Sequence, residues 1–252
     1  MRPARFVWAA LLVPFLLHVS FAQPTQRDEA RGDDRRGAEH YRAGRFAAAV
    51  ESFARAVRAR PTDANAVNNL GMAYSALGRY GEAEDALERA VSLKRDFAAA
   101  HYNLGSVYYE GGRREEAAAA FAEAVRLKPE HANAQYNLGV VRLELGRYAE
   151  AVESLSRAVR LAPRWAEANY MLALAHFESG RRAEALGSFR AAVRANPSYA
   201  AARDNLGVAG LALSERDVAF EQYRALKSLD ETLAARLYGG LHKNMLLDVT
   251  NK

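Results

Sequence analysis

The chain repeats a unit of 34 residues six times, and this period constrains its fold more than any other feature. The units begin at Ala30, Ala64, Ala98, Ala132, Ala166 and Ala200, without insertion or deletion between them. A fixed period of this length is typical of stacked helical repeats, each of which packs only on its neighbours. The sequence therefore predicts one elongated all-α array, because the segments outside the units are too short to bury a core of their own.

Each unit contains two helical patterns separated by a turn. In the third unit, Leu104 and Tyr108 are spaced as neighbours on one face of a helix. Gly112 then supplies the permissive backbone that a tight turn requires. A second apolar pattern around Phe121 continues until Pro129, which ends the helix. The unit is predicted to be a helix–turn–helix.

The residues at these positions resemble the signature of the tetratricopeptide repeat. In the third unit they are Leu104, Gly105, Tyr108, Gly112, Ala117, Phe121, Ala124 and Pro129, and most recur in the other units. The resemblance implies a right-handed superhelix of antiparallel helix pairs, in which the first helices line a concave groove that binds peptides and protein segments. The repeats would span residues 30–63, 64–97, 98–131, 132–165, 166–199 and 200–233.

The two ends of the chain carry different signals. Residues 1–22 contain two arginines, an apolar run and a small residue at Ala22, which predicts a secretory signal peptide followed by a linker at 23–29. The apolar run is shorter than the roughly 20 residues of a membrane-spanning helix, so we expect an exported protein, periplasmic or secreted. The arginine- and alanine-rich composition favours a bacterial envelope.

The last segment, 234–252, is predicted to be a capping helix and tail. Asp230 is placed to cap a helix that begins at Glu231, and Leu237 would help to cover the exposed end of the array. The adjacent Gly239 and Gly240 are expected to divide this helix.

Helical geometry indicates which side chains face the groove. A rotation of about 100° per residue places Asn103 and Glu110 opposite Leu104, with Tyr102 and Tyr109 on the flanks. Equivalent positions form an asparagine row (Asn69, Asn103, Asn137 and Asn205), a tyrosine row (Tyr102, Tyr136 and Tyr170) and a glutamate row (Glu110, Glu144 and Glu178).

These rows suit an extended peptide. Asparagine offers a donor and an acceptor to the ligand main chain, tyrosine adds contact area, and glutamate favours a neutral or basic segment. The asparagine row is similar to the ladder in the repeat domains of O-linked N-acetylglucosamine transferases. The alternative, which the sequence leaves open, is that these asparagines only bond to neighbouring backbone.

A further aromatic series, Phe97, His131, Trp165 and Tyr199, comes just before successive first helices. It is either a second binding surface or a set of residues that staple onto the following helical turn, and packing is the favoured interpretation. The tripeptide Arg31-Gly32-Asp33 also spells an adhesion motif, without supporting context.

Other functional classes have little support. The net charge of +5 comes from arginines interleaved with acids, which indicates a solvated surface rather than a nucleic-acid interface. The chain has no cysteine, and its histidines lack metal-binding spacing. No nucleophile or phosphate-binding motif is present. We therefore expect no catalytic residue, metal or cofactor.

The predicted function is that of a non-enzymatic exported scaffold that binds a peptide or protein segment in its groove. One alternative is a bacterial envelope assembly factor resembling the pilotins of pilus secretion systems, although those are lipoproteins and this chain has no cysteine to acylate. Another is an accessory subunit that positions a separate enzyme. The sequence does not indicate an oligomeric state.

Overall fold

The computed structural model describes residues 26–250, and the side chains of residues 29–242. The predicted signal peptide at 1–22 lies outside the described residues. The described part contains thirteen α-helices and no strand, which confirms the all-α fold class. The helices are α1 (Gln26–Arg42), α2 (Phe46–Ala59), α3 (Ala64–Ala76), α4 (Tyr80–Leu93), α5 (Ala98–Glu110), α6 (Arg114–Leu127), α7 (Ala132–Glu144), α8 (Tyr148–Leu161), α9 (Ala166–Glu178), α10 (Arg182–Ala195), α11 (Ala200–Ala212), α12 (Arg216–Leu229) and α13 (Glu231–Thr250).

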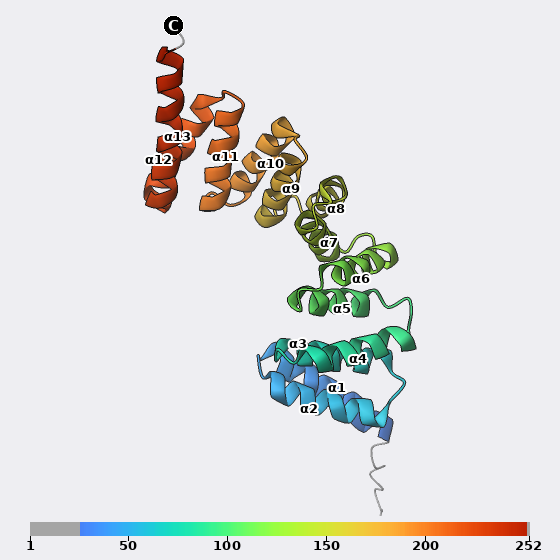
Figure 1. Cartoon of the computed structure of the whole chain (residues 1–252). Coiled ribbons are helices and arrows are strands. Elements are labelled where there is room, and N and C mark those ends of the chain that lie inside the picture. Colours follow the sequence, from blue (N-terminus) through green and yellow to red (C-terminus); the bar gives the residue numbers. More distant parts are fainter. Residues whose placement is uncertain (1–25, 251–252) are drawn as a thin grey trace, which may run out of the picture.

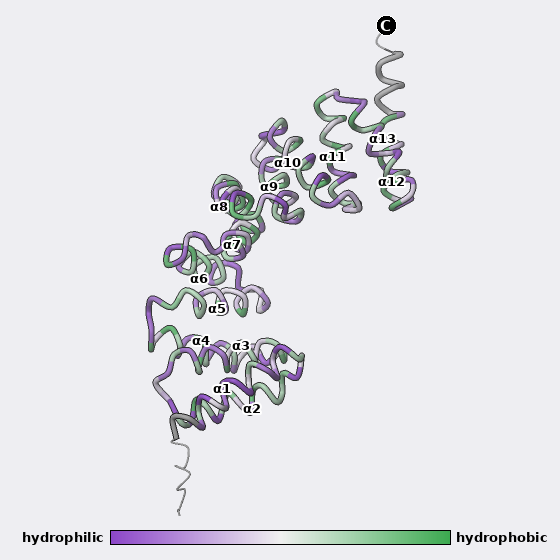
Figure 2. The backbone as a smooth tube through the Cα atoms, turned by 180° about the vertical axis from the view of Figure 1, so that it is seen from behind, coloured by the Kyte–Doolittle hydropathy of each residue, from purple (hydrophilic) through white to green (hydrophobic). Residues whose placement is uncertain are grey.

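The helices form successive pairs that stack into a curved, superhelical array. Each odd-numbered helix from α1 to α11 packs on the even-numbered helix that follows it, and each pair packs on the next (Figure 1). Figure 2 shows hydrophobic and hydrophilic stretches alternating along the helices, as expected where one face of each helix packs and the other meets water. The odd-numbered helices α1 to α11 are called the first helices of their units below.

Five of the six turns inside the units depend on glycine. Gly44, Gly78, Gly112, Gly146 and Gly180 have φ angles between 70° and 79°. The sixth unit has Ser214 at this position, with a φ of 63°. Because a side chain disfavours this left-handed conformation, the sixth turn carries a strain that the others avoid.

Close contact between the two helices of a unit depends on a second small residue. A Cβ atom added to Gly105 would lie 2.8 Å from Cδ1 of Phe121, and one added to Gly139 would lie 2.5 Å from Cγ of Leu155. The large side chain of the second helix therefore fills the space that glycine leaves on the first. The fifth unit has the fully buried Ala173 at this position.

The first unit places charged side chains at the N-terminal end of the array. Arg36 stands where later units have leucine, and its Nη2 lies 2.7 Å from Oδ1 of Asp33. Arg55 of α2 binds the same carboxylate through Nε at 2.9 Å. Asp33 is only 8% exposed. Because the Asp33 carboxylate is buried and paired with two arginines, it is not available to bind a receptor. The adhesion-motif interpretation of Arg31-Gly32-Asp33 is therefore not supported.

The C-terminal cap confirms two expectations and corrects a third. Oδ1 of Asp230 accepts a 3.0 Å hydrogen bond from the backbone N–H of Leu233, and Leu237 is 1% exposed at the end of the core. The prediction that Gly239 and Gly240 divide the cap is wrong, because α13 is continuous from Glu231 to Thr250. A Cβ on Gly240 would lie 3.0 Å from Cδ1 of Leu211, so glycine permits close packing on α11 instead of ending the helix.

Candidate functional site

A pocket of about 300 Å³ lies between the first helices α5 and α7. It is lined by Ser106, Tyr109, Glu110, Phe121, Tyr136, Asn137, Val140 and Val141. Four of these residues, Tyr109, Glu110, Tyr136 and Asn137, are predicted groove residues, and the pocket brings them together from two units. They meet because stacking lays α7 alongside α5, as the hydrogen bonds from Asn137 to Tyr102 and from Tyr109 to Glu144 show.

The asparagine row connects neighbouring first helices through side chains. Asn103 donates through Nδ2 to Oδ1 of Asn68 at 2.9 Å. Asn137 and Asn205 donate to the hydroxyls of Tyr102 and Tyr170, at 3.4 and 2.9 Å. Each acceptor lies 35 residues before its donor. The amide nitrogens thus hold successive units in register, and their partners are side chains rather than the neighbouring backbone.

The row is less regular at its other positions. Asn69 accepts a 3.5 Å hydrogen bond from Asn68 instead of bonding across units. Asp34, which would be its partner 35 residues earlier, forms an ion pair with Arg60. In the fifth unit Met171 replaces asparagine and has no N–H to donate. The cross-unit hydrogen bond is therefore a feature of three interfaces.

The tyrosine row packs on the aromatic series that precedes each following unit. The ring centroids are 4.9 Å apart for Tyr102 and His131, 4.5 Å for Tyr136 and Trp165, and 5.0 Å for Tyr170 and Tyr199. Three members of the series thus have a ring partner on the first helix of the unit that they close, in agreement with a packing role. This ring partner was not predicted, because the contact depends on how the chain returns from the second helix to the start of the same unit's first helix.

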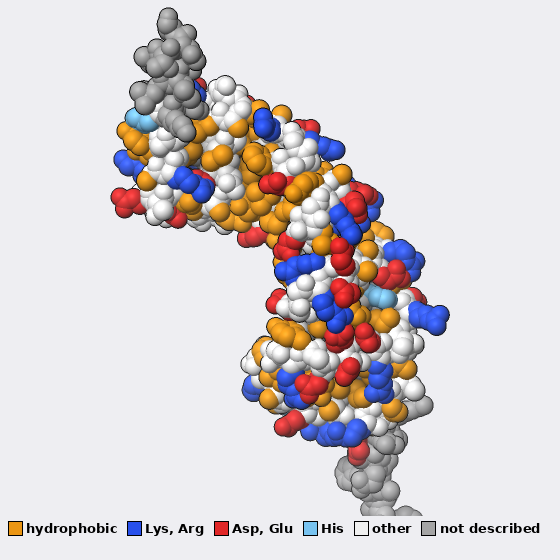
Figure 3. Space-filling view, in the orientation of Figure 1, with side chains coloured by type: hydrophobic (Ala, Val, Ile, Leu, Met, Phe, Trp, Pro, Cys, Tyr) orange, Lys and Arg blue, Asp and Glu red, His pale blue; other side chains and the backbone are white. Residues whose placement is uncertain are grey.

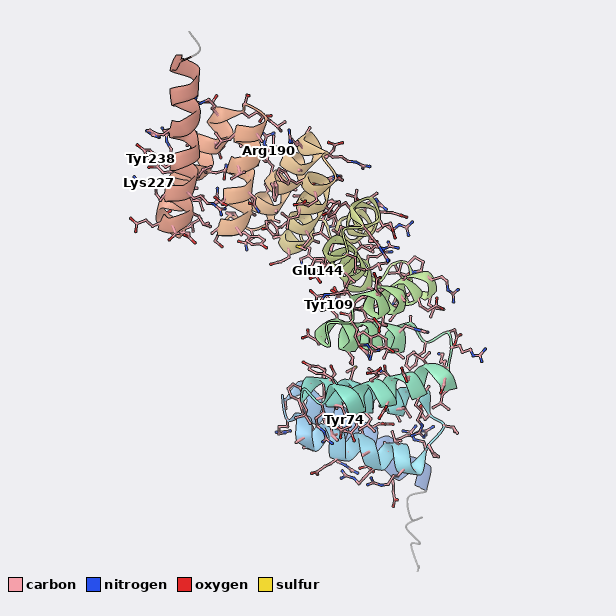
Figure 4. All side chains as sticks on the ribbon, viewed as in Figure 1. Tyr74, Tyr109, Glu144, Arg190, Lys227 and Tyr238 are labelled. Carbon is pink, nitrogen blue, oxygen red and sulfur yellow. The ribbon has the colours of Figure 1, made fainter. Side chains whose placement is uncertain are left out.

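The members of the glutamate row differ in their hydrogen-bonding and ion-pair partners. The Tyr109 hydroxyl donates a 2.5 Å hydrogen bond to Oε1 of Glu144, and both residues are labelled in Figure 4. Nε of Arg114 lies 2.5 Å from Oε2 of the same carboxylate. The bond to Glu144, together with burial, raises the pKa of Tyr109 to about 12. Glu144 is therefore charge-compensated. Glu110 and Glu178 are exposed, and neither has an ion pair or hydrogen-bonding partner among residues 29–242.

The guanidinium of Arg114 also covers one ring of the pocket. Its Cζ lies 4.2 Å from the ring centroid of Tyr109, within the range of a cation–π interaction. Nη1 of Arg114 donates to the backbone oxygen of Tyr109 at 2.5 Å. Tyr109 is thus held at three places: its hydroxyl, its backbone oxygen and one face of its ring.

Apolar side chains at two repeat positions lie beside the predicted residues and were not expected from the sequence. Val140 lines the pocket, and the same position in the sixth unit holds Val208, which is 39% exposed. Phe177 occupies the position of Tyr109 two units later and is 38% exposed. Figure 3 shows hydrophobic side chains gathered over α9 to α11. The sequence signal for these valines is their spacing from Ser106, which Val140 follows by one repeat and Val208 by three.

Neither a metal-binding cluster nor a membrane-spanning helix is found among the described residues. Among the described side chains, no group of three or more histidine, aspartate or glutamate residues is placed to hold a metal ion. None of the helices between residues 26 and 250 is long and apolar enough to cross a membrane. His176 is a half-buried titratable group: its Nδ1 atom is buried without a hydrogen-bonding partner, and burial lowers its pKa below the ordinary 6.5.

Comparison with solved structures shows the same architecture in other proteins. YrrB, described as a TPR protein with an unusual peptide-binding site, is 28% identical to this chain, with a TM-score of 0.69 over 75% of this chain and 99% of YrrB. The MamA protein is 25% identical, with a TM-score of 0.60 over 67% and 92% of the two chains. The pilF protein of Pseudomonas aeruginosa is 22% identical, with a TM-score of 0.72 over 84% and 98%, a likeness of fold.

The family comparison agrees with the structure. No curated protein matches the chain. A model of the tetratricopeptide repeat matches residues 35–100, 68–130, 102–164 and 170–234, which together make up most of the sequence. With its six stacked helix pairs, this chain belongs to the tetratricopeptide repeat family.

Proposed function

We propose that this protein is an exported, non-enzymatic scaffold that binds an extended segment of another protein along its first helices. The observation that carries the proposal is the pocket between α5 and α7, where Tyr109, Tyr136 and Asn137 line one concave surface. Pockets of this kind, with apolar walls and a few polar groups, are the usual binding sites of proteins.

The asparagine row would contribute acceptors to the ligand main chain. Nδ2 of Asn103 and Nδ2 of Asn137 are occupied by the preceding unit, whereas their Oδ1 atoms have no protein partner among the described residues. A peptide N–H can supply that partner regardless of the ligand sequence. The cross-unit hydrogen bonds hold the amide groups in place before binding, which reduces the entropic cost of forming the complex.

The structural relatives support a peptide as the ligand. YrrB covers three quarters of this chain and is described by its peptide-binding site. The two alternatives, an envelope assembly factor and an accessory subunit of a separate enzyme, differ from this proposal in the protein that is bound. A crosslinking pull-down distinguishes them, since recovery of secretin or porin components supports the first and recovery of an enzyme supports the second.

Binding to a peptide array tests the groove. The full chain should bind a subset of extended peptides, and replacing Asn103 and Asn137 with alanine should weaken that binding about tenfold while the protein remains folded. Chemical denaturation of the double variant measures the accompanying loss of stability. If the parent protein binds no peptide at all, the groove proposal is wrong.

Export is tested separately by sequencing the N-terminus of the protein isolated from cells that make it. We expect a new N-terminus after Ala22. Retention of Met1 would contradict the signal-peptide part of the proposal.

A further inference from the structure

The pocket between α5 and α7 has two aromatic walls that are fixed from outside. Tyr109 is held by Glu144 and Arg114. Tyr136 packs against Trp165, with ring centroids 4.5 Å apart and an interplanar angle of 34°. Because each ring has contacts away from the pocket, neither has to be ordered when a ligand enters. The pocket is therefore preorganised.

The floor of the pocket is apolar. Phe121 and Val141 are almost completely buried, and Val140 lies beside them. The hydroxyl of Ser106, the small polar group at this site, donates a 3.1 Å hydrogen bond to the backbone oxygen of Tyr102. A ligand group that enters between the rings thus meets a surface suited to methylene groups.

One charged group of the pocket lacks a partner. Glu110 lines the pocket and is exposed, and no described residue forms an ion pair with it. The nearby cation of Arg114 is already paired with Glu144 at 2.5 Å. The pocket therefore presents an uncompensated negative charge at the rim of an apolar, aromatic-walled space.

We propose that this pocket selects a ligand segment by a single arginine or lysine side chain. The aliphatic stem would lie between the rings of Tyr109 and Tyr136, and the cationic head would bind the carboxylate of Glu110. This inference rests on the proposed groove function and adds a side-chain specificity to it.

Each part of the pocket favours this class of side chain over others. Long basic side chains bury their methylene groups while keeping the charge at a polar edge. Their charge is attracted by the faces of tyrosine rings. An acidic side chain would be repelled by the carboxylate of Glu110. An aliphatic side chain would displace water from that carboxylate without supplying a positive charge to pair with it. The volume of about 300 Å³ is at the lower end of ligand pockets, which suits one side chain rather than a larger group.

The test uses short alanine–serine peptides that differ in one central residue: arginine, lysine, citrulline, norleucine or glutamate. Citrulline has nearly the shape of arginine without its charge. In binding titrations by nuclear magnetic resonance with the full chain, the arginine and lysine peptides should bind about tenfold more tightly than the citrulline and norleucine peptides. Glutamate should bind most weakly.

Variants then assign the selectivity to the pocket. Glu110→Gln should reduce the affinity for the arginine peptide about tenfold and leave the affinity for the citrulline peptide unchanged. Glu221→Gln removes the same charge from α12, which does not line the pocket, and should preserve the preference for arginine. Folding of both variants is checked by circular dichroism.

The results separate this inference from the groove function. Equal binding of the arginine and citrulline peptides, or an arginine preference that persists in Glu110→Gln, would overturn the side-chain selectivity while peptide binding itself stands. Failure of every peptide to bind would overturn the groove function and the selectivity together.

Discussion

The side-chain amide of Asn205 donates a 2.9 Å hydrogen bond to the hydroxyl of Tyr170, which lies 35 residues earlier on the preceding first helix. Tyr170→Phe removes the hydroxyl, so the side-chain amide of Asn205 loses its hydrogen-bond acceptor. We expect the free energy of unfolding to fall by about 1 kcal/mol, as measured by urea denaturation.

Tyr136→Phe is the matched control for this hydrogen bond. The residue 35 positions after Tyr136 is Met171, which cannot donate to the hydroxyl. The loss of stability should therefore be smaller than in Tyr170→Phe. Equal losses in the two variants would show that the asparagine does not connect the units energetically.

Gly139→Ala should destabilise the protein by about 1 to 3 kcal/mol, because the added Cβ would lie 2.5 Å from Cγ of Leu155 and 3.2 Å from its backbone nitrogen. Gly187→Ala in α10 is the control, since nothing lies within 4 Å of its added Cβ. That variant should be more stable by up to about 1 kcal/mol, because alanine favours the helix. Thermal denaturation distinguishes the two directions, and a stabilised Gly139→Ala would disprove the tight contact.

Ser214→Gly should stabilise the sixth unit by about 1 kcal/mol. Ser214 has a φ of 63°, which glycine adopts without the steric cost of a side chain. Ser228→Gly, in the last turn of α12, should have the opposite effect because glycine weakens a helix. The midpoints of chemical denaturation measure both changes. Unchanged stability in Ser214→Gly would mean that the turn carries no strain.

His176 should make the protein less stable in mild acid. Burial lowers the pKa of His176 in the folded chain, so as the pH falls the unfolded chain, with a pKa of about 6.5, binds the proton first. The stability present above that pH is therefore lost as the pH falls toward the lower, folded pKa. His176→Tyr, which introduces the residue found at this position as Tyr74 and Tyr108, should reduce the loss. Denaturation curves at pH 7 and pH 5 test this, and an unaltered loss in the variant would assign it to other groups.

Arg236→Ala should destabilise the C-terminal cap by about 3 kcal/mol, because it leaves the carboxylate of Asp204 buried without its cation. Asp204 is 1% exposed, and Arg236 of α13 forms an ion pair with it. Adding Asp204→Asn to Arg236→Ala removes the isolated charge and should restore part of the stability. Hydrogen exchange of α13 locates the effect. If the second substitution restores nothing, the pair is not the reason for the loss.

Much of the architecture was predictable because repetition makes local signals redundant. The glycine turns and the cap at Asp230 each follow from short-range chemistry that a sequence displays directly. The error at Gly239 and Gly240 arose because the propensity of glycine to interrupt helices was weighed without Leu211, the neighbour that favours a small residue there.

The candidate site was predictable only in part. Periodicity indicated which face of α5 and α7 carries Tyr109 and Asn137, because the angle between residues on a helix is known. It could not show that Glu144 is paired with Arg114 while Glu110 lacks a partner, since those pairings depend on the position of one unit relative to the next.

The sequence by itself determined the repeat, its helix–turn–helix unit and the helix faces on which the predicted groove residues lie, because these depend on spacing along one chain. Tertiary structure decided which charges are compensated, which rings pack together and where the first helices enclose a pocket. Those features depend on how helices pack within and between units, which brings residues 29 to 35 positions apart into contact.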